Sequence, residues 1–92
     1  MLLSFRCVDT RNLFDGARVA RWANIAGAAM RKLAMLNAAE VLGDLRIPPG
    51  NRLEALVGDR VGQHSIRVND QWRVCFTWTD SGPAEVEIAG YH

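Results

Sequence analysis

The stretch GQHSIRVNDQWRVCFTW, residues 62–78, decides how the rest of this chain folds. Two runs rich in β-branched and aromatic residues flank Asn69-Asp70, a pair suited to a tight turn, so the stretch predicts a β-hairpin. Side chains alternate between the two faces of a strand. One face of the hairpin is therefore apolar and is predicted to pack against helices, whereas the opposite face carries Arg67 and Arg73.

Two guanidinium groups fixed on the outer face of a sheet have two interpretations. They bind an anion, or they form ion pairs with Glu85 and Glu87 on the next strand along the chain. Alternation alone does not choose between the two, and both are kept as hypotheses.

Composition predicts one globular domain spanning residues 1–92, because 92 residues with 49% apolar content leave no room for a second core. No apolar run approaches the roughly 20 residues of a membrane span, and the first residues, MLLSFRCVD, become charged too early for a secretory signal. We therefore expect a cytoplasmic protein that does not enter a membrane. Cys7 and Cys75 are expected to be reduced thiols, and no His/Cys cluster has the spacing of a metal site.

Charge is unevenly distributed along the chain. The net charge of +1 argues against a protein that relies on bulk electrostatics to find nucleic acid. Residues 1–50, however, carry seven cations and four anions, whereas residues 51–92 carry four cations and six anions. The cationic half suits either RNA or an acidic partner segment, and charge counting does not choose between them.

The remaining sequence predicts helices before the hairpin and further strands around it. Asp9 is a suitable cap for the first helix, and Gly16 ends it. The later strands are joined by short turns and should form an antiparallel meander, with two helices covering one of its faces. The predicted order is β-α-α-β-β-β-β, an α+β fold, with a strand over 2–7, helices over 10–15 and about 22–39, a strand over 52–57, the hairpin, and a last strand over 84–92.

Few residues suggest chemistry by themselves. The chain ends at Tyr91-His92, directly after a predicted strand; histidine moves protons near neutral pH, and tyrosine donates a hydrogen bond or stacks on a base. The other interpretation is a frayed, inert terminus. Glu54 is either a general base or one end of an ion pair with Arg52, and the residues alone favour the pair. Arg60, in a predicted turn, either holds a phosphate or is simply solvated.

Taken together, RLEALVGDRVGQHSIRVNDQWRVCFTW (52–78) and VEIAGYH (86–92) resemble the HigB-type toxins of the RelE/ParE superfamily of type II toxin–antitoxin systems. The resemblance extends to SFRCVDTRNLFDG, RKLAMLNAA and DLRIPPGNRLEAL, so it covers essentially the whole chain. It implies a single RelE/ParE-like domain in which two helices pack on one face of a curved, mainly antiparallel sheet.

The activity that the resemblance implies is that of a ribosome-dependent mRNA interferase, a metal-independent endoribonuclease without cofactor that arrests translation. The ribose 2′-hydroxyl attacks the adjacent phosphate and expels the 5′-oxygen of the next nucleotide, which requires a base, a cation and an acid. The implied partners are the ribosome with its mRNA, a HigA-like helix-turn-helix antitoxin and, through that antitoxin, operator DNA.

The resemblance also assigns roles by position. Arg73 matches the arginine that contacts the scissile phosphate, for which a guanidinium fork is well suited. Tyr91 and His92 match the terminal pair that transfers protons and positions the nucleotide, and Glu54 stands where some relatives have histidine. Further contacts in the RNA groove are implied for Arg60, Arg67 and Asn69.

Two departures from the family pattern suggest reduced potency. Gly90 stands where the usual ending has aspartate, and Val57 stands where a basic residue is common. One alternative is therefore an attenuated toxin that retains mainly antitoxin binding and operon autoregulation. Another is a ParE-like, non-enzymatic inhibitor of DNA gyrase, which shares the fold.

Overall fold

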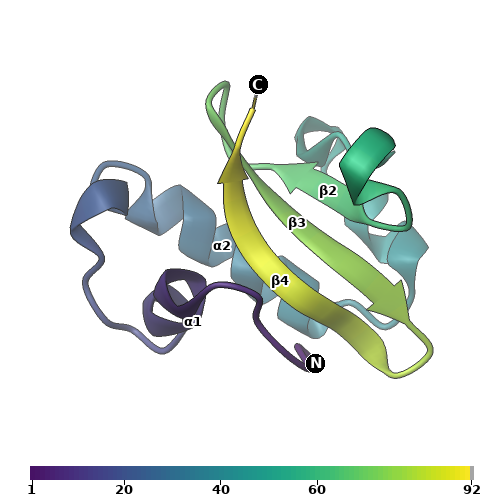
Figure 1. Ribbon diagram of the computed structural model, residues 1–92, viewed down its shortest axis with the longest axis horizontal. Coiled ribbons are helices and arrows are strands. Elements are labelled where there is room, and N and C mark those ends of the chain that lie inside the picture. Colours follow the sequence, from purple (N-terminus) through teal and green to yellow (C-terminus); the bar gives the residue numbers. More distant parts are fainter. Residues whose placement is uncertain (92) are drawn as a thin grey trace.

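The predicted hairpin forms the centre of a four-stranded antiparallel sheet (Figure 1). A computed structural model describes residues 1–91 of the chain. Strands β2 (His64–Arg67) and β3 (Trp72–Thr79) lie at the centre, and β1 (Glu54–Ala55) and β4 (Gly82–Gly90) flank them in the order β1-β2-β3-β4. The sheet is strongly curved, with β4 wrapping across the front of the view in Figure 1.

The turn between β2 and β3 is held by Asn69. Its side-chain Oδ1 accepts hydrogen bonds from the backbone N–H groups of Gln71 and Trp72, both at 2.8 Å. The backbone N–H groups of Val68 and Asn69 donate to the carbonyl oxygen of Trp72. Asparagine is favoured in turns because its side chain bonds to backbone two residues on, so the turn prediction is confirmed, with a loop longer than two residues.

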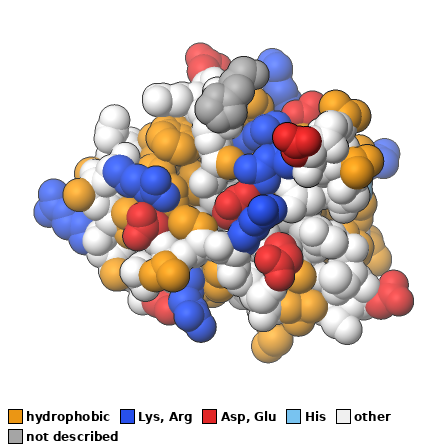
Figure 2. Space-filling view, in the orientation of Figure 1, with side chains coloured by type: hydrophobic (Ala, Val, Ile, Leu, Met, Phe, Trp, Pro, Cys, Tyr) orange, Lys and Arg blue, Asp and Glu red, His pale blue; other side chains and the backbone are white. Residues whose placement is uncertain are grey.

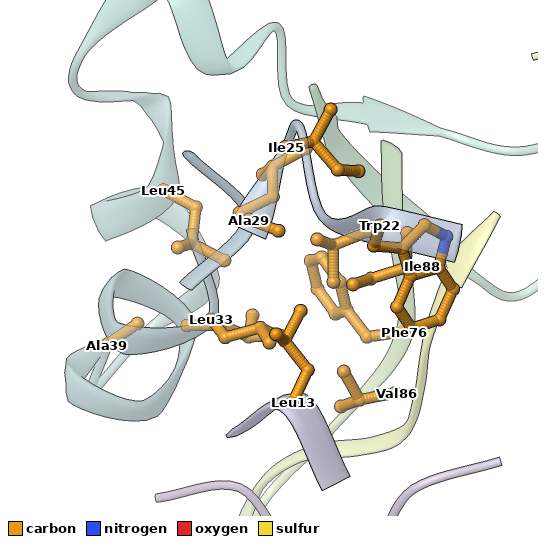
Figure 3. Packing of buried hydrophobic residues seen from close by; sticks show 13 residues of the cluster. Leu13, Trp22, Ile25, Ala29, Leu33, Ala39, Leu45, Phe76, Val86 and Ile88 are labelled. Carbon is orange, nitrogen blue, oxygen red and sulfur yellow. The ribbon is translucent and has the colours of Figure 1, made fainter. Parts of the chain in front are cut away.

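Two helices cover the inner face of the sheet. They are α1 (Val8–Phe14) and α2 (Ala26–Ala38); in Figure 1, α2 passes behind the strands and α1 lies beside β4. Helix α2 buries Ala29, Leu33 and Leu36, which recur at helical spacing, against inward-facing strand residues such as Val74 and Phe76. This apolar cluster is the core of the domain (Figure 3). Within residues 1–91 no helix combines the length and apolar character needed to cross a membrane.

The predicted first strand is reduced to one parallel bridge between Phe5 and Val86. The cause lies in β4, whose register against β3 shifts between Cys75 and Thr77. Opposite this shift Glu85 adopts a left-handed backbone conformation, with φ of 53°. A bulge of this kind bends its strand and interrupts pairing. The amino-terminal segment therefore pairs with β4 only beside the bulge.

Two other predicted elements are shorter than expected. The helix predicted over 22–39 begins only at Ala26, because the short 3₁₀ helix Ala20–Trp22 precedes it and turns Trp22 fully into the core. The strand predicted over 52–57 is limited to the two residues of β1. Arg52 adopts a left-handed conformation, with φ of 46° and ψ of 53°, which delays pairing until the next residues.

A buried asparagine fixes the connector that leads to β1. This connector contains the 3₁₀ helices η2 (Leu42–Arg46) and η3 (Pro49–Asn51). The Asn51 side chain donates to the carbonyl oxygen of Leu45 at 3.1 Å and accepts a hydrogen bond from Lys32 Nζ on α2 at 2.5 Å. Asn51 thereby sets the position from which Arg52 and β1 continue. The α+β class, the two helices on one face and the antiparallel sheet are confirmed.

Candidate functional site

The outer face of the sheet carries a row of polar side chains across all four strands. Glu54 on β1 lies opposite Ser65 on β2, Ser65 opposite Cys75 on β3, and Cys75 opposite Glu87 on β4. The Ser65 hydroxyl lies 3.5 Å from a carboxylate oxygen of Glu54. Figure 2 shows this face, with basic and acidic side chains gathered over the strands.

A second row places the arginines of the hairpin side by side. Arg67 lies directly opposite Arg73, which in turn lies opposite Ala89. Arg73 is partly buried, and within residues 1–91 its Nε atom is shielded from solvent without a hydrogen-bond partner. The Cζ atom of Arg73 lies 5.2 Å from the centre of the Tyr91 ring, a cation–π contact. The guanidinium therefore has a fixed position and unused donor capacity.

Backbone pairing holds Tyr91 over this arginine. The Tyr91 N–H donates to the carbonyl oxygen of Gln71 at 2.9 Å, so the chain beyond β4 stays beside the hairpin turn. Burial raises the pKa of the Tyr91 phenol, and the Glu54 carboxylate raises it further. The cationic Arg73 and Arg67 oppose that rise of the pKa. At neutral pH the phenol is consequently a hydrogen-bond donor rather than a base.

Within residues 1–91 the hairpin arginines form no ion pair with Glu85 or Glu87, so the hypothesis that they pair with glutamates of the last strand is wrong. Glu87 pairs with Arg60, whose Nη1 atom lies 2.7 Å from the carboxylate and 3.0 Å from the side-chain oxygen of Gln63. The hydrogen bond to Glu87 raises the pKa of Arg60. Arg67 pairs with Asp70 in the turn. Arg73 has no ion pair within the described part of the chain.

The thiol on this face is buried and unreactive. Cys75 is fully buried, and burial raises its pKa above the usual thiol value, against the opposing effect of Arg73 and Arg60. A thiol of this kind stays protonated and is a poor nucleophile. Both Cys7 and Cys75 are free cysteines. Among residues 1–91, no three His, Cys, Asp or Glu side chains are grouped as metal ligands.

Glu54 borders three adjoining hollows. One, of about 370 Å³, is also lined by Arg52, Arg67, Asp70 and Tyr91. A second, of about 250 Å³, includes Arg60 and Arg73, and a third, of about 430 Å³, leads away beneath β1. We call the first two the central groove. A phosphate in the central groove would meet guanidinium groups on both sides of one carboxylate.

The structure brings most of the predicted site residues together. Arg73, Tyr91, Arg67 and Glu54 all border the central groove, and Arg60 borders it while held by Glu87, so that the RNA contact predicted for Arg60 stays a prediction.

Two site predictions have a different outcome. The Asn69 side chain is used to hold the hairpin turn, and His92 lies outside the described residues.

Arg52 lines the groove without an ion pair to Glu54 among residues 1–91. Sequence reasoning missed it as a groove residue, because its left-handed backbone sets its direction and no sequence signal marks that conformation.

These features define a small α+β protein with a basic groove on the free face of its sheet. Residues 13–90 match the family model described as the RelE-like toxin of the type II toxin–antitoxin system HigB. The chain belongs to this HigB-like family of toxins.

Two curated proteins are similar to this chain over slightly more than 60% of its length. The chain is 54% identical over 57 residues to Toxin HigB-1 of Vibrio cholerae, which covers 62% of this chain and 60% of that protein. It is 40% identical over 58 residues to an uncharacterized protein of Haemophilus influenzae, which covers 63% of this chain and 57% of that protein. The chain thus spans less than two thirds of either relative.

Proposed function

We propose that this HigB-like toxin is an endoribonuclease that cuts mRNA on the ribosome and thereby arrests translation. The observation that carries the proposal is the arrangement of Arg73, which lies on a central strand against Tyr91 and whose Nε atom has no hydrogen-bond partner among the described residues 1–91. An arginine with spare donors in a groove suits a phosphate that gains charge during a reaction.

The proposed reaction is an internal phosphoryl transfer. The 2′-oxygen forms a bond to the adjacent phosphorus as its proton passes to a base. We assign this role to Glu54, which borders the central groove. Arg73 stabilises the charged phosphorane. The P–O bond to the 5′-oxygen breaks as that oxygen takes up a proton, leaving a 2′,3′-cyclic phosphate and a 5′-hydroxyl. Tyr91, as a protonated phenol, donates to the phosphate or nucleotide, and the resemblance assigns His92 to proton transfer.

Partners and location follow from the family. A type II toxin has an antitoxin partner, and we propose a HigA-like helix-turn-helix protein that neutralises this chain and carries the complex to operator DNA. The ribosome and its mRNA in the cytoplasm are the proposed target.

The test is induced expression combined with mapping of mRNA 5′ ends. Wild-type protein should arrest growth and generate new 5′ ends within translated codons, whereas Arg73→Ala and His92→Ala should do neither. Arg18→Gln is the matched control, because Arg18 is exposed in the loop between α1 and the 3₁₀ helix Ala20–Trp22 and borders none of the three hollows. Growth arrest with intact mRNA and damaged DNA would contradict the proposal and favour a gyrase inhibitor.

A weakened form of the same function is the second candidate. Val57, beside the central groove, is 83% exposed and offers RNA no charge where family members commonly have a cation. If the chain only binds antitoxin, Arg73→Ala will leave growth under induction unchanged from wild type.

A further inference from the structure

The hollow beneath β1 is the largest of the three and has no role in the proposed cleavage. It has a volume of about 430 Å³ and continues from the central groove, because Arg52 and Glu54 border both. Its wall combines two arginines, an imidazole and apolar side chains from η2, η3 and the edge of the sheet: Arg46, Arg52, His64, Leu42, Pro49 and Leu53.

The two arginines that enter this hollow are available to a ligand. Arg46 and Arg52 are exposed, and neither has an ion pair within residues 1–91. Among residues 1–91, Glu54 is the one carboxylate along the same wall, so the cations outnumber it. Arg52 also keeps a left-handed backbone, a strained conformation for a residue with a side chain and one that clusters at binding sites.

The remaining wall suits a flat, partly apolar group. The His64 ring stacks on Phe76, with ring centres 6.3 Å apart and planes 23° from parallel. Its Nδ1 atom is shielded and has no hydrogen-bond partner among residues 1–91. The ring thus packs against Phe76 of the core while it borders the hollow, and Leu53 lies in the same wall.

We propose that this hollow, the edge subsite, binds a nucleotide of the RNA strand next to the one that is cut. The phosphate lies between Arg46 and Arg52, and the base lies against His64 and Leu53. Grooves that bind single-stranded nucleic acid combine cations that follow the backbone with flat side chains on which bases stack. The proposal rests on the proposed function only in taking RNA as the ligand.

Continuity with the central groove favours a nucleotide over an acidic peptide. An RNA strand whose scissile phosphate meets Arg73 passes Glu54 and Arg52 before it leaves the sheet at β1, and the edge subsite is the next hollow along that path. A peptide carboxylate would match the arginines equally well but would leave the flat wall at His64 unused.

The experiment measures mononucleotide binding, which requires no cleavage. Adenosine 5′-monophosphate and uridine 3′-monophosphate are titrated into the full-length, isotope-labelled protein, and NMR shifts are followed at the Leu53 methyls, the His64 ring and the arginine side chains. Inorganic phosphate and a poly-glutamate peptide are titrated in parallel. We expect both nucleotides to move all three sets of signals, and phosphate to move only the arginine signals.

The variants are chosen to preserve the fold. Arg46→Gln removes one exposed charge, and Arg52→Asn removes the other while keeping a residue that tolerates the left-handed conformation. Each should weaken nucleotide binding roughly five- to tenfold, since an interaction with a charged group is worth about 1 kcal/mol or more. Arg18→Gln should leave binding unchanged.

Three results would overturn the edge subsite: unchanged affinity in both variants, shifts confined to the surroundings of Arg67 and Tyr91, or binding of the peptide without binding of either nucleotide. Failure of the proposed function is a separate result, because intact mRNA in expressing cells would refute cleavage while leaving nucleotide binding at Arg46 and Arg52 measurable.

Discussion

At the scale of single residues, the Arg73 side chain is partly buried, yet its Nε atom has no hydrogen-bond partner within residues 1–91. A buried donor without a partner costs about 1–3 kcal/mol, and Tyr91 compensates only in part through the cation–π contact at 5.2 Å. A phosphate in the central groove would satisfy the donor, and binding that phosphate is the role that we propose for this side chain.

The first prediction concerns the replacement of the planar Arg73 guanidinium by the compact ammonium group of lysine. Arg73→Lys should lower the cleavage rate about 10- to 100-fold, because lysine retains the charge but cannot bond two phosphate oxygens in a fixed plane. The free energy of unfolding should stay the same or rise, since the unpaired Nε atom is removed. Single-codon cleavage rates in a translating extract, together with urea unfolding, check both statements. Wild-type cleavage by Arg73→Lys would mean that charge alone suffices.

The second prediction concerns pH. The pKa of Tyr91 is raised by burial, so its phenol stays protonated at every pH below its usual value of about 10. Tyr91→Phe should therefore slow cleavage about tenfold by removing a donor, without changing the shape of the rate profile between about pH 6 and 9. A wild-type rate that rises with pH across this range, and a loss of that rise in the variant, would instead identify Tyr91 as the base.

The third prediction restores the family's aspartate. A Cβ added at Gly90 would meet Gln71 at 3.8 Å and the Trp72 ring at 3.9 Å, which are ordinary contacts. Gly90→Asp should thus be accommodated and should increase cleavage several-fold if the missing carboxylate limits activity. Gly90→Asn has the same shape without the charge and is the control. Equal gains from Asp and Asn, or none from either, would refute an electrostatic cause.

At the scale of elements, the bulge in β4 is the feature that shapes the sheet. It bends the strand where the amino-terminal segment meets it, and the backbone N–H of Ile88 just beyond it donates to the buried Thr10 hydroxyl of α1 at 3.0 Å. That bond ties the first helix to the strand that continues to Tyr91. The bulge therefore links the packing of α1 to the position of the groove.

The fourth prediction tests the strain at this bulge. Glu85 is exposed and holds a left-handed φ of 53°. Glycine adopts this conformation readily, so Glu85→Gly should raise the free energy of unfolding by up to about 1 kcal/mol. Glu85→Ala removes the same charge but keeps the strain and should give no gain. Thermal unfolding of both variants decides the matter, and an equal gain in the glycine and alanine variants would assign the effect to charge.

The sequence predicted local structure well and long-range pairing poorly. The hairpin, the turn at Asn69 and the inward faces of β3 and β4 follow from alternation and turn chemistry, both of which depend on neighbouring residues. The pair Arg60–Glu87 joins positions 27 residues apart and depends on how η4 (Gly58–Arg60) folds back over the sheet. Alternation carries no information on that approach, which is why Glu87 was expected to pair with the hairpin arginines.

The same contrast between local structure and long-range pairing applies to the shortened elements and to the site. A strand over residues 2–7 has suitable residues, but its partner β4 is interrupted by the bulge. Residues of the central groove were predicted one by one from the resemblance to HigB-type toxins. The edge subsite, by contrast, depends on the left-handed backbone at Arg52 and on the connector fixed by Asn51. Neither of these two features produces a recognisable sequence pattern.

At the scale of the whole molecule, charge and binding surface are separated. Residues 1–50, which contain both helices, hold the excess of cations, whereas residues 51–92, which form the sheet and line the central groove, are net acidic. Attraction of RNA by the overall field is therefore weak at a net charge of +1. Affinity for RNA should come from a few groove arginines, each acting over a short distance.

The fifth prediction concerns how the affinity for RNA depends on salt concentration. For an RNA oligonucleotide whose attacking 2′-hydroxyl is replaced by hydrogen, the slope of log affinity against log salt should be about −2 to −3, since each phosphate neutralised on a single strand contributes about −0.7. Arg73→Gln should reduce the steepness by about 0.7, because it removes one groove contact, whereas Arg18→Gln, which removes the same charge from the helical half, should leave the slope unchanged. If both variants change the slope equally, RNA binding depends on the net charge of the whole molecule. That result would contradict the central groove as the binding site.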